Sequence, residues 1–156
     1  MGGDAVRRAT PGEAVVVAEL LDAFNREFES PTPGIRALAA RLVGLLGAGD
    51  VVALLVGEPA VGLAVLTFRP NVWFDGPVAL LDELYVEPAR RGEGLGGELL
   101  AAAEALVRER GAELLEINVD GEDVDARRFY ERHGYANHEP GQTEAQLYYF
   151  KELSGP

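Results

Sequence analysis

The residues from Val86 to Leu100 constrain the fold of this chain more than any other segment. An apolar run over residues 79–86 ends in a short loop that carries two arginines, and four glycines follow within residues 92–97, where an Ala/Leu-rich helix begins. Glycines let the backbone approach a ligand closely, and the N–H groups and the dipole at a helix start favour an anion. We therefore expect a strand, a loop and a helix that together cradle a phosphorylated cofactor.

Two known phosphate-binding motifs fit this segment poorly. The phosphate loop of nucleotide triphosphatases is excluded because Gly97 is followed by Glu98 rather than by Lys and Ser or Thr. The dinucleotide fingerprint G-x-G-x-x-G matches Gly92, Gly94 and Gly97, and Asp120 lies near the spacing of its acidic residue. In that fold the first glycine follows the strand almost directly, whereas residues 87–91 intervene here. A nicotinamide-dependent oxidoreductase is therefore a remote alternative.

A third pattern fits better and is supported by a second signature downstream. The sequence Val-Glu-Pro-Ala-Arg-Arg-Gly-Glu-Gly-Leu-Gly, residues 86–96, resembles the acetyl-coenzyme A motif of the GNAT superfamily of N-acetyltransferases. Its core, Arg/Gln-x-x-Gly-x-Gly/Ala, is met by Arg91, Gly94 and Gly96. Residues 126–135 resemble the family's second signature, a short helix that closes in Phe/Tyr-Tyr-x-x-x-Gly-Phe/Tyr. The two signatures have the order and separation of the family.

The resemblance implies a fold class for the whole chain. We expect one GNAT-like acetyltransferase domain over residues 1–156, with the mixed α/β (α+β) acyl-CoA N-acyltransferase fold. Its central sheet is mixed and mostly antiparallel, with about six to seven strands flanked by about four helices. The sheet is expected to splay apart between the strand before the cradle and the next strand along the chain.

Local signals predict the same order of elements. Residues 10–13, Thr-Pro-Gly-Glu, form a capping box with proline at the first helical position, so a helix begins there and runs to about Glu29. A second helix, with Leu38, Leu42 and Leu45 on one apolar face, ends near residues 47–49. Further helices are expected at about 94–110 and from the 120–123 loop to Gly134, and strands at 5–8, 51–56, 61–68, 80–86, 114–119, 135–138 and 145–151.

Composition narrows the function. The chain has 156 residues, 47% of them hydrophobic, which is enough for a core, and no cysteine, which excludes disulfides and thiolate metal sites. We expect no metal. No apolar run approaches ~20 residues and the N-terminus lacks a signal peptide, so we expect a cytoplasmic protein that does not span a membrane. The net charge of −12 argues against nucleic acid and suits either solubility or attraction of a cationic amine.

The resemblance also implies how acetyl-coenzyme A binds as cosubstrate. Backbone N–H groups of the cradle would hold the pyrophosphate, and the pantetheine arm would bind the preceding strand like an added strand. Asn118 could assist from the next strand, or its alternative role is that of a buried asparagine that fixes a loop. Asp123 stands where the family often has asparagine. The predicted cofactor-binding residues are Leu84, Val86, Arg91, Gly92, Gly94, Leu95, Gly96, Gly97, Asn118 and Asp123.

Three residues are candidates for the chemistry. Tyr130 matches the family position that often protonates the leaving thiolate, and its alternative role is to pack the short helix beside Phe129. Asp82 and Glu83 are candidates for the base that accepts the proton of the incoming amine. Alternation along a strand sends neighbouring side chains to opposite faces, so at most one of the two carboxylates faces the cleft unless the strand bulges. We favour Glu83.

The resemblance implies a small-molecule or peptide amine as the acceptor, and its cationic form would suit a site of carboxylates and aromatic rings. The resemblance places that site at the link between the first two helices and at the loop before the cradle strand, with Glu27, Phe28, Glu29, Trp73 and Phe74 as candidates. A homodimer is also consistent with the resemblance. The alternative in another class is a non-catalytic acyl-coenzyme A sensor or interaction module on the same fold.

Overall fold

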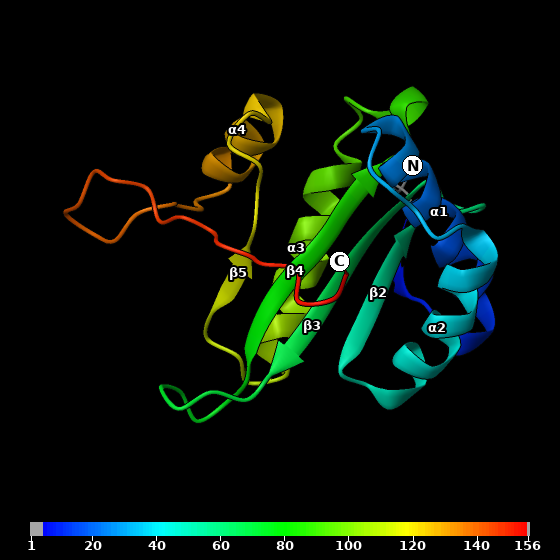
Figure 1. Ribbon diagram of the computed structural model, residues 1–156, viewed down its shortest axis with the longest axis horizontal. Coiled ribbons are helices and arrows are strands. Elements are labelled where there is room, and N and C mark those ends of the chain that lie inside the picture. Colours follow the sequence, from blue (N-terminus) through cyan, green and yellow to red (C-terminus); the bar gives the residue numbers. More distant parts are fainter. Residues whose placement is uncertain (1–4, 156) are drawn as a thin grey trace. The chain divides into compact units, whose positions relative to one another are not determined.

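The computed structural model describes residues 5–155, and its chain divides into an N-terminal unit that ends at Ile117 and a C-terminal unit that begins at Asn118. The N-terminal unit is an α+β structure (Figure 1). Its elements are β1 (Val6–Arg8), α1 (Ala14–Glu27), α2 (Ile35–Ala48), β2 (Val51–Val56), β3 (Gly62–Arg69), β4 (Val78–Val86), α3 (Leu95–Glu109) and β5 (Leu115–Ile117), with 3-10 turns at Pro11–Glu13 and Pro88–Arg90. The C-terminal unit contains α4 (Val124–Arg132).

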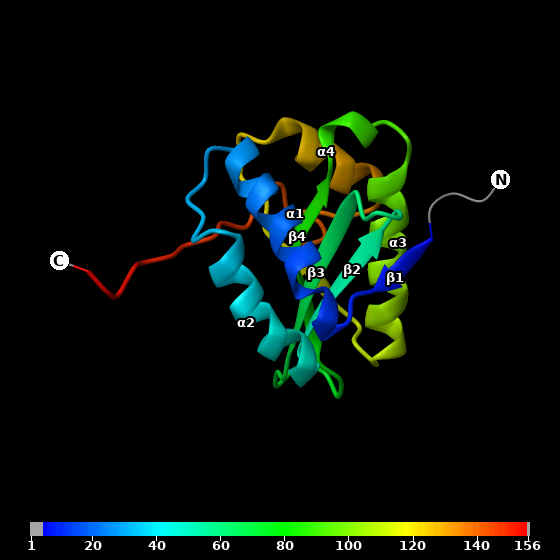
Figure 2. The ribbon, with the colours of Figure 1, turned by 90° about the vertical axis from the view of Figure 1, so that its right-hand side faces the viewer.

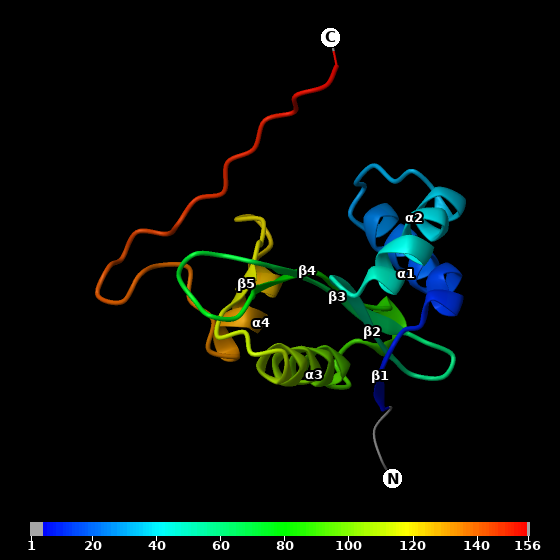
Figure 3. The ribbon, with the colours of Figure 1, turned by 90° about the horizontal axis from the view of Figure 1, so that it is seen from below.

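The sheet has five strands in the order β1-β2-β3-β4-β5. Each pair from β1 to β4 is antiparallel, and β5 is parallel to β4. Figure 3 shows α1 and α2 on one face of the sheet and α3 on the other. This mostly antiparallel sheet agrees with the expected fold and is not the doubly wound parallel sheet that a dinucleotide-binding fold requires.

The two helices on one face cover one buried hydrophobic cluster. Figure 2 shows α1 and α2 side by side across the strands. Val17 of α1 and Leu42 of α2 belong to one buried cluster with Leu55, Leu63 and Tyr85 from three strands. Burying such a side chain contributes roughly 1.5–3 kcal/mol, so this face fixes the position of α1 against β4. None of the helices described between residues 5 and 155 is long and apolar enough to cross a membrane.

The predicted capping box is present at the start of α1. The Thr10 N–H donates to the Glu13 carboxylate over 3.2 Å, after which the chain makes a 3-10 turn before the α-helix begins at Ala14. The helix ends at Glu27 rather than at Glu29 because Glu29 adopts a left-handed conformation with φ 55°. The predicted apolar face of α2 is wrong in one position. Leu42 and Leu46 are buried, whereas Leu45 is 46% exposed because it lies about 60° around the helix from Leu42.

Predictions for the strands near the C-terminus are wrong. Residues 135–138 and 145–151 form no strand, and β5 has three residues rather than the six predicted over 114–119. The sheet described between residues 5 and 155 therefore has five strands instead of six to seven. The side chains of Leu147, Tyr148, Tyr149 and Phe150 are 69–83% exposed. The local composition favours a strand, but a strand also needs a neighbouring strand for its backbone hydrogen bonds.

Candidate functional site

The loop between β4 and α3 has the backbone geometry of an open cradle. Gly92 and Gly94 have φ of 83° and 85°, a left-handed conformation that other residues rarely adopt. A Cβ at either position would meet no atom within 4 Å, so the space beside this backbone is open. Gly96 and Gly97 lie in the first turn of α3 with ordinary helical geometry. The four glycines therefore serve two purposes, the turn itself and close access to the helix start.

The start of α3 offers three hydrogen-bond donors. The first hydrogen bond of the helix runs from the Glu98 N–H to the Gly94 carbonyl over 3.1 Å. The N–H groups of Leu95, Gly96 and Gly97 come before it, so they have no acceptor within the helix. They lie at the positive end of the dipole of a 15-residue helix. Backbone donors at such a terminus suit the pyrophosphate of coenzyme A.

The two arginines of the loop are held by carboxylates. The Arg90 Nε donates to both carboxylate oxygens of Glu93, at 2.9 and 3.1 Å. The Arg91 guanidinium donates to both carboxylate oxygens of Glu27, each over 2.7 Å, and its Nε donates to the Val86 carbonyl over 2.9 Å. The charge of each loop arginine is therefore matched by a carboxylate.

The pairing of β4 with β5 ends in the region where the resemblance predicts that the sheet splays. The pairing of β4 with β5 ends at Leu81 and Ile117, whereas β4 continues to Val86. On that side of β4, residues 82–86 are paired with no strand described between residues 5 and 155. Leu84 and Val86, predicted to bind the pantetheine arm, lie in this segment. An extended ligand could pair with these residues of β4 as a further strand does.

A β-bulge brings the two candidate bases to one face. Val65 pairs with Glu83 and Leu66 with Leu81, so Asp82 is an extra residue on β4. Glu83 shares its face with Val65, which is buried against α1 and α2. Asp82 accepts a hydrogen bond of 2.8 Å from the Thr67 hydroxyl, and Thr67 lies on the face of Val65, two residues away. Both carboxylates therefore face the α1 and α2 side.

The environment raises the pKa of both carboxyl groups. Partial burial raises the pKa of Asp82, although the Thr67 hydrogen bond opposes the shift and the residue as a whole is exposed. Burial, and secondarily the negative charge of Asp82, raises the pKa of Glu83 above its ordinary value of 4.5. Glu83 is half-buried, and both its burial and the charge of Asp82 raise its pKa. A carboxylate with a raised pKa is suited to accept a proton.

The end of α1 lies beside β4 through a stack of aromatic rings. Phe24 stacks on Tyr85 with ring centroids 5.0 Å apart, and Phe28 meets Phe24 edge-on at 5.4 Å. This stack places the predicted acceptor residues Glu27, Phe28 and Glu29 next to the cradle end of β4. Phe28 is 53% exposed.

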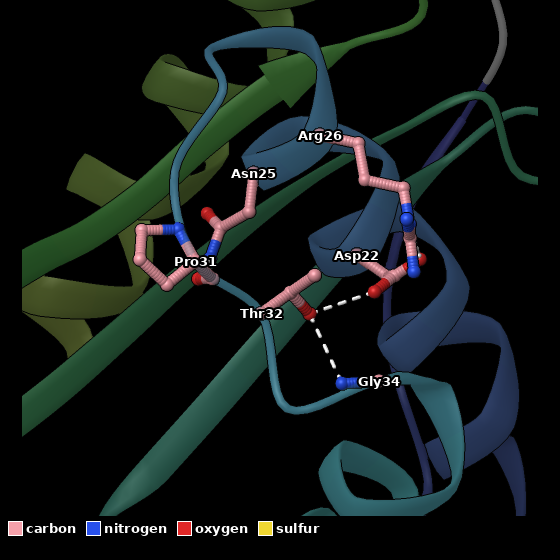
Figure 4. A network of polar contacts seen from close by, with 6 residues as sticks. All are labelled: Asp22, Asn25, Arg26, Pro31, Thr32 and Gly34. Atoms are coloured by element: carbon pink, nitrogen blue, oxygen red, sulfur yellow. Dashed lines mark hydrogen bonds and ion pairs between the residues drawn. The ribbon is translucent and has the colours of Figure 1, made fainter.

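The link between α1 and α2 is fixed by a polar network that the sequence analysis missed (Figure 4). Asp22 is 5% exposed and accepts hydrogen bonds of 2.7 Å from both the Thr32 hydroxyl and the Arg26 Nε. Thr32 in turn accepts from the Gly34 N–H over 3.2 Å, and the Asn25 amide donates to the Pro31 carbonyl over 3.0 Å. The sequence signal was a single carboxylate between Leu21 and Ala23 within an apolar helix.

The remaining acceptor candidates lie elsewhere. Trp73 and Phe74 are in the loop between β3 and β4, at the end of β4 opposite the cradle. The nine residues of β4 span about 30 Å at ~3.3 Å per residue. Trp73 is 86% exposed, and the Asn71 side chain accepts hydrogen bonds from the N–H groups of both aromatic residues over 2.8 Å. The structure does not bring these two aromatic residues together with the end of α1.

Three predicted residues belong to the C-terminal unit. Asp123 caps α4 by accepting a hydrogen bond of 3.0 Å from the Ala126 N–H, which gives this carboxylate a structural use. Tyr130 is half-buried, with the rings of Phe129 and Tyr135 edge-on at 5.2 and 5.9 Å. The Tyr130 carbonyl accepts a hydrogen bond from the Tyr135 N–H over 3.0 Å, so Tyr135, the last residue of the second signature, is bonded to the end of α4. Asn118 is the first residue of the unit.

Comparison with known proteins agrees with this geometry. The model of the Acetyltransferase (GNAT) family matches residues 17–135. A crystal structure from Arthrobacter sp. FB24, of a protein assigned as an acetyltransferase, is 62% identical with a TM-score of 0.92 and covers 98% of both chains. The chain belongs to the GNAT family of acetyltransferases.

Two curated relatives are N-acetyltransferases with different acceptors in their names. The aminoglycoside N(6')-acetyltransferase type 1 of Stenotrophomonas maltophilia is 30% identical over 147 residues, which are 92% of this chain and 90% of the relative. The aminoalkylphosphonate N-acetyltransferase of Salmonella typhimurium is 40% identical over 83 residues. That second match spans about half of each protein, 53% of this chain and 53% of the relative.

Proposed function

We propose that this protein transfers an acetyl group from acetyl-coenzyme A to a primary amine by direct attack. The observation that carries the proposal is the course of β4. Its bulge presents Asp82 and Glu83 on one face, its unpaired edge follows, and after the 3-10 turn at Pro88–Arg90 the chain enters the cradle at the start of α3. One strand thus joins a candidate proton acceptor to a candidate site for the coenzyme.

The cradle residues fit coenzyme A. The N–H groups of Leu95, Gly96 and Gly97 would bind the pyrophosphate, beside the open space at Gly92 and Gly94. The edge of β4 near Leu84 and Val86 would bind the pantetheine arm, with the Val86 carbonyl already accepting from Arg91. When bound, acetyl-coenzyme A supplies an activated thioester.

Glu83 would prepare the amine for attack. An alkyl ammonium has a pKa of about 10.4, so it must lose a proton before its nitrogen can form a bond. Glu83, with its raised pKa, would accept that proton directly or through a water molecule. The amine nitrogen then bonds to the thioester carbon, and a backbone N–H of β4 would stabilise the developing oxyanion.

Tyr130 is proposed as the acid that completes the reaction. As the carbon–sulfur bond breaks, the Tyr130 hydroxyl would donate its proton to the leaving sulfur, and the new amide nitrogen would lose its second proton, which returns the Tyr130 phenolate to the hydroxyl. The products would be the N-acetylated amine and free coenzyme A. Asp123 is proposed only as a residue close to the coenzyme, because its carboxylate already caps α4. Asn118 is proposed for the same region on the resemblance alone.

The proposed acceptor is a small cationic amine. Glu29 just after α1, with Asp82 and Glu83 on β4, puts carboxylates around the candidate acceptor side, whereas the Glu27 carboxylate is paired with Arg91, in a chain of net charge −12. The two relatives named for aminoglycosides and aminoalkylphosphonates support a small amine rather than a protein. Trp73 and Phe74 are proposed for the acceptor only if it is long enough to reach the far end of β4.

Calorimetry with acetyl-coenzyme A, with NADH in parallel, tests the coenzyme first. Binding of acetyl-coenzyme A alone supports the proposal, and binding of NADH alone overturns it. Release of free thiol is then measured with a panel of aminoglycosides, aminoalkylphosphonates and polyamines. Thiol release with any amine supports catalysis, whereas coenzyme binding without turnover supports the non-catalytic sensor.

A further inference from the structure

Arg91 bridges three elements around the entrance of the cradle. Its guanidinium donates two hydrogen bonds of 2.7 Å to Glu27, the last residue of α1, and one of 2.9 Å to the carbonyl of Val86, the last residue of β4. Arg91 itself leads into the cradle. The same guanidinium lies 5.7 Å from the centre of the Tyr85 ring, on which Phe24 of α1 stacks. A single side chain therefore fastens α1 to the cradle.

The pairing is specific rather than a loose surface contact. It is bidentate and joins residues 64 positions apart in sequence, and the Glu27 and Arg91 side chains are only 28% and 44% exposed. The hydrogen bond to Glu27 raises the pKa of Arg91 further, so the guanidinium stays charged. Three of its five N–H donors are already used, and its charge is matched by a carboxylate.

The segment that follows Glu27 is held firmly at its other end. Residues 28–34 link α1 to α2, and the Asp22 network fixes Thr32 and Gly34 within this link. Fastening Glu27 to Arg91 therefore fixes the near end of the same link to the cradle. A displacement of one would displace the other, which couples their free energies of binding.

We propose that the Glu27–Arg91 ion pair couples the acceptor site to the coenzyme site, with Glu27 as the positioning residue that holds Arg91 at the entrance of the cradle. The inference rests on the proposed function. It assigns Arg91 a role in fastening α1, and the pyrophosphate is bound by the backbone. Loss of Glu27 lets Arg91 and the start of the cradle move. This movement weakens the binding of the coenzyme and the binding of the acceptor together.

Calorimetry with coenzyme A on the E27Q variant shows whether the loss of the Glu27 charge weakens or strengthens coenzyme binding. We expect the Kd to rise about threefold to fivefold, the range of a well-formed, partly exposed ion pair. If Arg91 were instead a pyrophosphate ligand for which Glu27 competes, E27Q would bind coenzyme A more tightly than the unchanged protein. Tighter or unaltered binding overturns the proposal.

A double-mutant cycle supplies the second readout. E27Q and R91K each remove the bidentate pair, so we expect the double variant to bind coenzyme A no more weakly than the weaker of the two single variants. We expect all three to raise the KM of the acceptor more than they lower kcat. Additive effects on the Kd overturn the coupling. E19Q removes the same charge from an exposed position of α1 and is the matched control.

These outcomes are separate from those of the proposed function. If the unchanged protein fails to bind coenzyme A at all, the proposed function fails. If it binds and E27Q behaves like E19Q, only the coupling fails. Thermal melting of each variant establishes that the fold is retained, and E27D, whose shorter side chain keeps the charge, is expected to restore part of the affinity.

Discussion

The hydroxyl of Thr67 on β3 donates a hydrogen bond of 2.8 Å to the carboxylate of Asp82, the extra residue of the β4 bulge. This contact keeps Asp82 on the face of the sheet that Glu83 also occupies. The charge of Asp82 is one of the two causes that raise the pKa of Glu83. Thr67, which makes no proposed contact with a substrate, therefore influences the candidate base through a neighbouring carboxylate.

Replacing Thr67 with valine should raise the pKa of Asp82 and lower the pKa of Glu83. The hydrogen bond lowers the pKa of Asp82, so its loss should raise that pKa further. Asp82 is then neutral over a wider pH range, and the pKa of Glu83 should fall towards 4.5 as the repulsion weakens. Carboxyl carbon NMR titration measures both shifts. Thr32→Val is the control, because it removes a hydroxyl from Asp22 instead. A Glu83 pKa that rises or stays constant in Thr67→Val would contradict the coupling.

Glu83→Gln should lower kcat/KM by roughly 10²–10⁴, the usual contribution of a general base. In the unchanged protein the rate should rise with pH through a pKa above 4.5, because Glu83 must lose its proton before it accepts one. This acid limb should disappear in the variant. Steady-state rates between pH 4.5 and 8 provide the measurement, and calorimetry should show unchanged binding of acetyl-coenzyme A.

Asp82→Asn distinguishes the two carboxylates. It should lower the rate less than Glu83→Gln and move the acid limb to lower pH, because it removes the charge that raises the pKa of Glu83. If Asp82→Asn abolishes activity while Glu83→Gln retains it, Asp82 is the base.

The bulge also shows where prediction from sequence ends. The cradle glycines and the capping box are local patterns, and the structure contains both. Strand alternation predicts opposite faces for Asp82 and Glu83 and fails because one residue is added to β4 against β3. A bulge depends on how two strands are paired, and neighbouring residues along one strand do not reveal that register.

Contacts distant in sequence were equally invisible. Glu27 and Arg91 were predicted for different sites, the acceptor and the coenzyme, and only the fold brings them to 2.7 Å. The stretch from Leu147 to Phe150 has the composition of a strand, but composition does not supply a partner strand. Local propensity was therefore sufficient for most elements and insufficient for the pairing between them.

Gly94→Ala should weaken acetyl-coenzyme A binding while the protein stays folded. The residue has φ 85° and no atom within 4 Å of an added Cβ, so the substitution introduces backbone strain of about 1–2 kcal/mol without a clash. We expect the Kd to rise at least tenfold in calorimetry, because relaxing the strain turns the cradle donors away. Gly111→Ala, at φ 77° with equally open surroundings beyond the other end of α3, should cost similar stability and leave the Kd unchanged. Equal Kd values of the two variants for acetyl-coenzyme A would show that the cradle does not bind the coenzyme.

Asp22→Asn should destabilise the protein near neutral pH and lose that effect in acid. Hydrogen bonds from Thr32 and Arg26 lower the pKa of Asp22 below its ordinary value of 3.8 (Figure 4). The ionised carboxylate therefore contributes stability that is fully present above pH 3.8 and is lost as the pH falls through the lower, folded-state pKa. Urea unfolding of both proteins from pH 7 downwards should show their difference shrinking below pH 3.8. A difference independent of pH would mean that the charge of Asp22 does not contribute.

Two glycine-to-alanine substitutions should change the free energy of unfolding in opposite directions. A Cβ on Gly76 would overlap the Gly111 carbonyl oxygen, a backbone atom that cannot rotate away, so Gly76→Ala should cost roughly 1–3 kcal/mol. Gly44 is exposed within α2, with no atom within 4 Å of an added Cβ, so Gly44→Ala should stabilise by about 0.5–1 kcal/mol. Urea unfolding at pH 7 measures both. Because neither residue has a positive φ, equal effects of the two substitutions would show that the loop before β4 does not pack against Gly111 in solution.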